Sequence, residues 1–526
     1  MTILEKFPQM VRRCAILLAM LIAPPVPFTA AQQPLTVVAA VSADPGHLNP
    51  AITTGSPTHA VADSLFNGLL SLNENGEPQA DLAVRWAFSE DGLRARFDLA
   101  KDAKWHDGQP VTAEDVKFSF ETVLIRHHAR TRASLGPVLQ AVDVIDPATV
   151  EFRLKRPYPA LLQQLDVTEA PILPRHVYGV GEIERNPANL KPVGSGPFRF
   201  ESYAKDDRVV LVRNPAYFKQ GLPRAERLVF RVIPDGTTQA QALAAGEVDF
   251  VGRVAPSEIA RLQRAGRTTL TDVKFGPGGG NCIMTLGFNL DRPALQIREV
   301  REAFAAAIDR RQFVERILLD HGRVADAPIS SGIAWAHAPG TFPASLFDPA
   351  KAKALLDAAG LKPDSEGVRL TVELVQFASF GRYADLLRDQ LGSVGIRVQP
   401  RLVDPAAMVD AVFKQRNFDL TLISYCNGSD PEIGVRRMYV SDNIGDIPFS
   451  NAAAYRNKEI DELFATAGST VNRERRAEAY RAMQRLVVRD LPYIWLVETD
   501  FTVGWKADLA GFAGWSGQFA ERAGPR

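Results

Sequence analysis

The sequence predicts an α/β protein that is built from more than one domain. Strand-like runs alternate with helical runs along most of the chain, and segments far apart in sequence have to pair. The chain has 526 residues, more than one hydrophobic core organises, so two or three domains are expected. Basic and acidic residues number 61 each, and this balance argues against nucleic acid or an anionic membrane as a partner.

Hydrophobic periodicity predicts the individual elements. Continuous or alternating apolar runs indicate strands at 35–41, 94–99, 149–154, 208–213 and 228–233. Apolar residues at helical spacing predict helices at 59–70 and 238–245, and Gly246 ends the second of these. Another helix is expected where Val300, Phe304 and Ala307 share one face.

The first 31 residues have the pattern of a cleaved secretory signal peptide. Arg12-Arg13 precede an apolar run at 14–23, and small residues at 29–31 offer a cleavage site. The apolar run is too short to span a bilayer, so a retained membrane anchor is the weaker alternative. The mature chain is therefore expected to be soluble and periplasmic.

Cys282 and Cys426 are the cysteines that remain after residue 31. An even number of cysteines in an exported chain favours a disulfide between them. Two buried free thiols are the alternative, which the sequence leaves open.

The stretch 82–120 carries the most specific pattern in the chain. Asp91-Gly92 forms a hairpin turn before a strand, and Trp105-His106-Asp107-Gly108 forms a second turn. Thr112 then caps a helix with an acidic first turn. In this order the stretch resembles the signature of the extracytoplasmic solute-binding proteins, family 5, which serve peptide and nickel ABC importers.

Four later blocks extend the resemblance over nearly the whole mature chain. They are Gly194-Ser-Gly-Pro-Phe198 with the segment to Asp249, then 288–310, 347–360 and 455–495.

The resemblance implies a periplasmic-binding-protein fold of the large peptide-binding type, with two lobes, an extra domain and a ligand cleft between the lobes. The Gly276–Gly280 run suits a hinge, since glycine absorbs the backbone rotation of closure. The implied division is a signal peptide at 1–31, lobe I at 32–75, 187–281 and 495–526, an extra domain at 76–186, and lobe II at 282–494.

The resemblance also locates a candidate ligand site where the strand at 418–426 enters a polar turn. Relatives that bind peptides have an aspartate four residues before the proline of this turn, and this chain has Asn427 there. An amide lacks the charge that assists an ammonium contact, so a peptide ligand is placed in doubt. Asp430 either compensates or caps the next turn, and Tyr425 beside Cys426 is either a ligand wall or core.

Three further residues complete the expected ligand site. Arg436 is a candidate for a ligand carboxylate, with a solvent-facing arginine as the alternative. His47 and Asn49 are expected at the cleft edge by the resemblance.

The expected function is that of a monomeric, periplasmic solute receptor that delivers a short peptide or peptide-like ligand to an ABC membrane permease. A receptor for an opine, a sugar conjugate or a nickel complex is the alternative within the class. A secreted hydrolase is disfavoured because no nucleophile motif appears, and a peptide-holding chaperone activity stays open. No cofactor or metal is expected, because the adjacent His127 and His128 diverge on a helix and His106 lies in a structural turn.

Overall fold

The structure, a computed structural model, describes residues 35–273, 275–276, 279–445, 449–513 and 517–526. The expected signal peptide lies outside the described residues, and so do residues 277 and 278 of the expected hinge run. Residues from Leu35 to Arg526 form one compact unit. Within the described ranges, no helix is long and apolar enough to cross a membrane.

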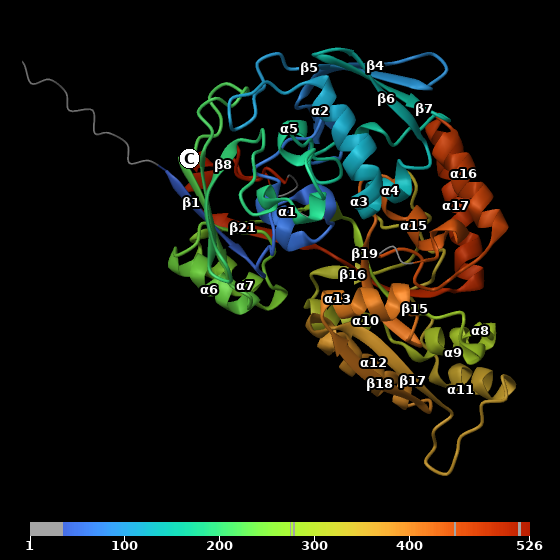
Figure 1. The fold of residues 1–526 in the computed structure, drawn as a ribbon. Helices are drawn as coiled ribbons and strands as arrows, with labels where there is room; N and C mark the ends of the chain where they lie inside the picture. The colour runs from blue at the N-terminus through green and yellow to red at the C-terminus, as the bar shows by residue number, and fades with distance from the viewer. Residues whose placement is uncertain (1–34, 274, 277–278, 446–448, 514–516) are drawn as a thin grey trace, which may run out of the picture. The chain divides into compact units, whose positions relative to one another are not determined.

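Three sheets of four or more strands organise the described residues, which confirms the α/β class (Figure 1). We call them the first, second and third sheets. The first has the order β12-β21-β11-β1-β10-β9-β8, the second β16-β20-β15-β19-β17-β18, and the third β4-β5-β7-β6.

The first sheet is mixed, with a parallel centre. Its strands, in the order just given, are Thr268–Val273, Phe501–Lys506, Phe250–Val251, Thr36–Val41, Arg227–Val232, Arg208–Arg213 and Phe198–Ala204. Strand β1 runs parallel to both β10 and β11, so these strands end at the same edge of the sheet. Helices α6 (Gly236–Ala245) and α7 (Pro256–Ala265) pack beside it (Figure 1).

The second sheet is built around β15. Its strands, in the order given, are Gly322–Val324, Tyr493–Thr499, Cys282–Phe288, Leu420–Cys426, Leu370–Phe377 and Ile396–Val403. Every residue of β15 is buried, because the strand is antiparallel to β19 on one side and β20 on the other. Helices α9 (Arg298–Ala307), α11 (Pro349–Ala358) and α12 (Gly381–Gly392) contribute to its core.

The third sheet lies within the expected extra domain. Its strands are Ala83–Phe88, Arg94–Leu99, Thr149–Leu154 and Leu139–Asp146. Helix α2 (Ala113–Phe118) begins where expected, and the Asp115 carboxylate accepts hydrogen bonds from the Thr112 backbone N–H and hydroxyl, both at 2.9 Å. The Trp105 indole N–H donates to the same carboxylate at 3.3 Å, so Asp115 links the turn at Trp105 to the start of α2.

His106 connects the signature turn to the Gly-Ser-Gly block. The Gly194 N–H donates to Nδ1 at 3.1 Å, and Nε2 lies 3.1 Å from the Gly196 carbonyl oxygen. Because Nδ1 accepts a hydrogen bond, the ring proton is on Nε2 and the imidazole is neutral. Burial first of all lowers the pKa of His106 to about 4, in keeping with this structural role.

The strands at 94–99, 149–154 and 208–213 are confirmed as β5, β7 and β9, but the helix at 59–70 is wrong. Helix α1 covers only Ser56–Ala62. Beyond it the backbone makes tertiary hydrogen bonds, including one from the Gly196 N–H to the Leu65 carbonyl at 2.9 Å. A Cβ on Gly68 would lie 2.4 Å from the Leu165 carbonyl oxygen, so this close packing overrides the helical periodicity.

The chain crosses between the first and second sheets at two places. Strand β12 ends at Val273 and β15 begins at Cys282, while β20 ends at Thr499 and β21 begins at Phe501. Closely spaced crossings of this kind are typical of hinged pairs of domains. The division into two lobes and an extra domain stays a prediction, as does the hinge.

Candidate functional site

A cavity of about 530 Å³ lies where the first sheet faces the second. One wall comes from the ends of β1 and β11, which lead into Ser42 and Gly252-Arg253, together with Ser56 at the start of α1. The other wall includes Cys282, Ser424 and Cys426 of β15 and β19. We call this space the cleft cavity. Its position beyond the ends of parallel strands is common for ligand sites in α/β proteins, and its volume suits a small solute.

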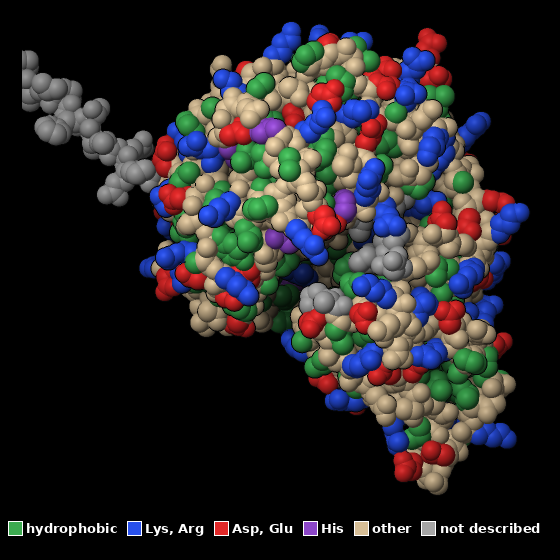
Figure 2. All heavy atoms as spheres, in the orientation of Figure 1, with side chains coloured by type: hydrophobic (Ala, Val, Ile, Leu, Met, Phe, Trp, Pro, Cys, Tyr) green, Lys and Arg blue, Asp and Glu red, His purple; other side chains and the backbone are tan. Residues whose placement is uncertain are grey.

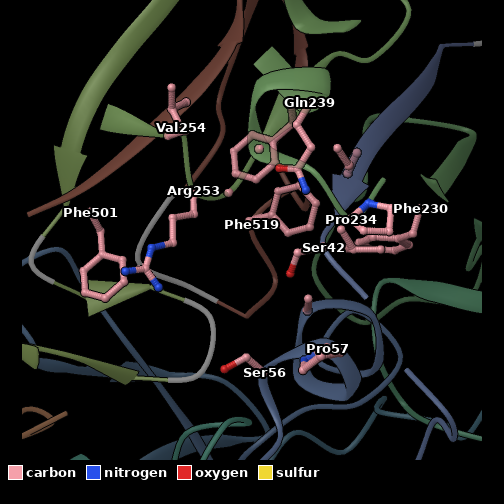
Figure 3. Close-up of a pocket in the computed structure, with 18 of the residues that line it drawn as sticks. Ser42, Ser56, Pro57, Phe230, Pro234, Gln239, Arg253, Val254, Phe501 and Phe519 are labelled. Carbon is pink, nitrogen blue, oxygen red and sulfur yellow. The ribbon is translucent and has the colours of Figure 1, made fainter. Parts of the chain in front are cut away.

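The lining of the cleft cavity is mostly apolar and aromatic. Four aromatic rings line it, those of Phe230, Phe250, Phe501 and Phe519. Ser42 and Ser56 add hydroxyl groups to the lining (Figure 3). A few polar groups on an apolar wall are what a specific small-molecule pocket requires.

Arg253 is the charged residue among the described residues that line the cleft cavity. Its guanidinium lies beside the Phe501 ring, with Cζ at 4.7 Å from the ring centroid (Figure 3). The Arg253 side chain is exposed to the cavity. Desolvation by the surrounding protein lowers the pKa of its guanidinium. The charge of Arg253 also acts on Tyr383 of α12, opposing the rise that burial causes in the pKa of that phenol.

The disulfide between Cys282 and Cys426 is confirmed. The two residues are directly paired on neighbouring antiparallel strands, with their Cα atoms 3.8 Å apart. Because both cysteines line the cleft cavity, the disulfide forms part of its wall on the side of the second sheet.

Asn427 follows the disulfide but lies beneath the surface of the cleft, with 1% of its area exposed. Its Oδ1 accepts a hydrogen bond from the Ser330 N–H at 2.7 Å, and its backbone N–H donates to the Asn281 carbonyl at 3.2 Å. Its Nδ2 has no hydrogen-bond partner within the described residues. It is absent from the described lining of the cleft cavity, so its expected ligand role is untested.

Tyr425 packs in the core of the second sheet. Its ring contacts that of Tyr493, and its hydroxyl donates to the Ser450 carbonyl at 2.8 Å. Of the two roles expected for Tyr425, the structure therefore favours core packing over a ligand wall.

Asp430 and Arg436 belong to a buried charge network. Asp430 caps the next turn by accepting from the Glu432 N–H at 3.0 Å, and Arg476 donates to both of its carboxylate oxygens. Arg436 Nε lies 3.2 Å from Glu432 Oε1. Burial raises the pKa of Glu432 to about 7 against the opposing effect of Arg436. Both predicted ligand residues thus have protein partners.

His47 and Asn49 hold the segment before α1. Asn49 is fully buried, and its side chain accepts from the Ala51 N–H at 3.0 Å and donates to Asn189 at 2.9 Å. His47 Nδ1 accepts from the Asn49 N–H at 3.2 Å. The structure therefore brings only Cys426 of the predicted ligand residues to the lining of the cleft cavity.

A second cavity, of about 340 Å³, shares Cys282 with the cleft cavity. Its charged lining residues are Asp272, Arg323, Glu498 and Asp500, and we call it the acidic cavity. Arg323 lies 3.1 Å from Glu498 and 2.6 Å from Asp500, while the Thr502 hydroxyl donates to Asp272 at 2.5 Å.

Near the acidic cavity, Glu498 approaches Asp326 and His337 at a spacing that a metal ion could bridge. These groups have protein partners: His337 Nε2 lies 3.2 Å from Asp326, and Glu498 accepts from the Ser331 N–H at 2.8 Å. Arg323 beside Glu498 opposes a cation there.

Sequence reasoning missed Arg253 and Phe501. Phe501 has no local pattern that marks it, and both residues become part of the site only when β11 and β21 pair in the first sheet. The usable signal was a cation placed directly after a short buried strand, beside Gly252.

Comparisons with known proteins identify the family of the chain. Residues 77–446 match the family model for bacterial extracellular solute-binding proteins, family 5. A Brucella ovis protein, named as an ABC transporter peptide-binding protein, is 29% identical over 467 residues, which are 85% of this chain and 84% of that protein. The glutathione-binding protein GsiB of Salmonella choleraesuis is 26% identical over 484 residues, which are 90% of this chain and 91% of that protein.

A solved structure has the same fold. The crystal structure of NikZ from Campylobacter jejuni in complex with Ni(L-His) superposes with a TM-score of 0.79 at 25% identity, covering 91% of this chain and 96% of NikZ. The family model covers well over half of the sequence, so the chain belongs to the family 5 extracellular solute-binding proteins. The predicted family and the periplasmic-binding-protein fold are thereby confirmed.

Proposed function

We propose that this protein is the periplasmic receptor of an ABC importer and that it binds a short peptide or peptide-like solute in the cleft cavity. The observation that carries the proposal is that residues of both sheets line that one cavity. A solute that touches both walls gains its full binding energy only when the walls approach each other, so binding favours a closed state. The permease would then receive the solute from the closed receptor.

The two sheets would be the cores of the two lobes, with residues 76–186 as the extra domain and residues 1–31 as a signal peptide. The crossings between Val273 and Cys282 and between Thr499 and Phe501 would act as the hinge. The receptor is proposed to act as a monomer.

The composition of the cavity bears on the alternative ligands. No histidine or carboxylate is among the described residues that line the cleft cavity, so a nickel ion would depend on its own organic ligand. An opine or sugar conjugate stays the alternative within the class. A hydrolase or a peptide-holding chaperone is the alternative from another class, and membership of a family of binding proteins disfavours the hydrolase.

Blocking the cavity tests the proposal. Ala60 lines the cavity from α1, and Ala60→Trp would place an indole ring in the cavity and obstruct it. We expect the wild-type chain, exposed to a dialysed metabolite extract, to retain solutes detectable by native mass spectrometry, and Ala60→Trp to retain none. Ala245→Trp, on the exposed end of α6, is the control and should behave as wild type. Equal retention by Ala60→Trp, or retention of nothing by wild type, would refute binding in this cavity.

A further inference from the structure

The charges around the cleft cavity restrict the kind of solute it can hold. Arg253 brings a positive charge to the lining, and the described lining residues include no acid to balance it. No ion pair forms between Arg253 and any carboxylate in the described residues. The Arg253 side chain is exposed at the cavity, and a cation on an apolar wall without a counter-charge attracts an anion that enters.

The guanidinium also has an aromatic neighbour. Its Cζ lies 4.7 Å from the centroid of the Phe501 ring, a cation–π distance that stabilises the guanidinium at this wall of the cavity. A planar fork of donors matches a carboxylate with two parallel hydrogen bonds. Several phenylalanine rings line the rest of the cavity, so the body of the solute would meet an apolar surface (Figure 3).

Among the lining residues that the structure describes, an ammonium group finds no equivalent partner in the cleft cavity. Position 427 holds a buried amide whose oxygen is already used by the Ser330 N–H. The carboxylates of the acidic cavity have partners of their own, with Arg323 between Glu498 and Asp500. A free amine carried into the cleft cavity would lose hydration without gaining a counter-charge.

We propose that the solute has a carboxylate, held by Arg253, on an apolar or aromatic body, and that it has no free amine: an N-acylated peptide or amino acid, or a comparable organic acid. This inference rests on the proposed function and specifies the ligand class for the same cavity. The discriminating feature is the solute's amine end, because peptides with and without a free amine share the same carboxylate.

Three probes with the same side chains separate the end groups. They are N-acetyl-phenylalanyl-leucine, phenylalanyl-leucine, and phenylalanyl-leucine amide, each titrated into the mature chain by calorimetry at neutral pH. We expect the acetylated acid to bind most tightly, the free dipeptide to bind at least about 10-fold more weakly, and the amide, which has only the cation, not to bind measurably.

Substitutions of Arg253 test whether its guanidinium binds the carboxylate of the solute. Arg253→Gln should weaken binding of the acetylated acid by about 10- to 100-fold, the range for a charge-assisted pair, and Arg253→Lys should weaken it less. Arg264→Gln is the matched control, because it makes the same charge change on the exposed end of α7 and should leave binding unchanged. Unchanged melting temperatures of the empty variants would establish that Arg253 acts on the solute and not on the fold.

Several outcomes would overturn the inference. They are equal or tighter binding of the amide or free dipeptide, undiminished binding by Arg253→Gln, and failure of all three probes to bind. If the free dipeptide binds tightly and Asp500→Asn abolishes that binding, the amine is recognised in the acidic cavity. If the wild-type chain still retains extract solutes that Ala60→Trp excludes, the proposed function stands while this inference fails. If it retains none, the proposed function itself fails.

Discussion

At the scale of single residues, Asn427 and His59 are two buried polar side chains whose charge matters for stability. Asn427 is neutral, and its Nδ2 has no hydrogen-bond partner in the part of the chain that the structure describes. His59, on α1 beside the cleft cavity, is fully buried between two acceptors: the Asp63 carboxylate lies 2.8 Å from Nδ1 and the Thr53 carbonyl lies 3.0 Å from Nε2. Both ring nitrogens can donate only if the imidazole is protonated. A charge is therefore expected to destabilise the protein at position 427 and to stabilise it at His59.

Asn427→Asp should destabilise the protein. A carboxylate at this buried site keeps the acceptor for the Ser330 N–H but loses its hydration, which costs about 1–3 kcal/mol of unfolding free energy. Denaturant unfolding at neutral pH measures the difference. Asn75→Asp makes the same change in an exposed turn and should have little effect. Unchanged stability, or tighter binding of phenylalanyl-leucine by Asn427→Asp, would contradict the neutral role assigned to this position.

His59 should make stability depend on pH. Burial alone would lower its pKa, but the Asp63 charge and hydrogen bonds together raise it above the ordinary value of 6.5. The stabilisation is therefore fully present below the unfolded-state pKa and is lost as pH rises through the higher folded-state pKa. The contribution of His59 to the slope of melting temperature against pH should be negative between about pH 5.5 and 8.5, and His59→Gln should remove this contribution. His176→Gln, at an exposed site, should preserve it, and an unchanged slope in His59→Gln would refute the assignment.

At the scale of elements, strands were predicted better than the site was. The alternation in 94–99, 149–154 and 208–213 is local, and the structure has strands with those bounds. The 59–70 helix was wrong because hydrogen bonds to the distant Gly196 replace helical ones after Ala62. The disulfide was predicted from the even number of cysteines in an exported chain. Arg253 was missed because only the pairing of β11 with its neighbours brings it to the cleft.

The pairing of β15 with β19 predicts the effect of removing the disulfide. The bond closes a loop with a sequence separation of 144 residues, and loops of that length give about 4–5 kcal/mol in the chain-entropy model. The double substitution Cys282→Ala and Cys426→Ala should lower the unfolding free energy by about 2–5 kcal/mol in denaturant titrations. Protein from the periplasm, denatured without reductant, should have no titratable thiol at either position. Two equivalents of free thiol would contradict the bond.

The contact between the Gly-Ser-Gly block and the segment after α1 is equally testable. A Cβ on Gly194 would lie 1.8 Å from the Leu65 carbonyl oxygen, which is backbone and has little freedom to move. Gly194→Ala should therefore lower the unfolding free energy by about 1–3 kcal/mol. Gly392→Ala, in α12 with no neighbour within 4 Å of a new Cβ, should instead be neutral or slightly stabilising. Equal effects of the two substitutions would refute the close approach.

At the scale of the whole molecule, the face shown in Figure 2 has no dominant patch of one charge. Lys and Arg side chains are interspersed with Asp and Glu over the face in Figure 2, in line with 61 of each in the sequence. Long-range attraction therefore contributes little to selecting the solute, and selection depends on contacts inside the cleft cavity.

Solute binding should bring the walls of the cleft cavity together. The two walls belong to different sheets that are joined by two short crossings, so the solute stabilises the arrangement in which both walls contact it. Small-angle scattering with saturating solute should give a smaller radius of gyration than scattering without it. Ala60→Trp, which should not bind, provides the control and should show no change on addition of the same solute. If calorimetry confirms binding to the wild type while its radius of gyration stays constant, the receptor binds its solute without hinge closure.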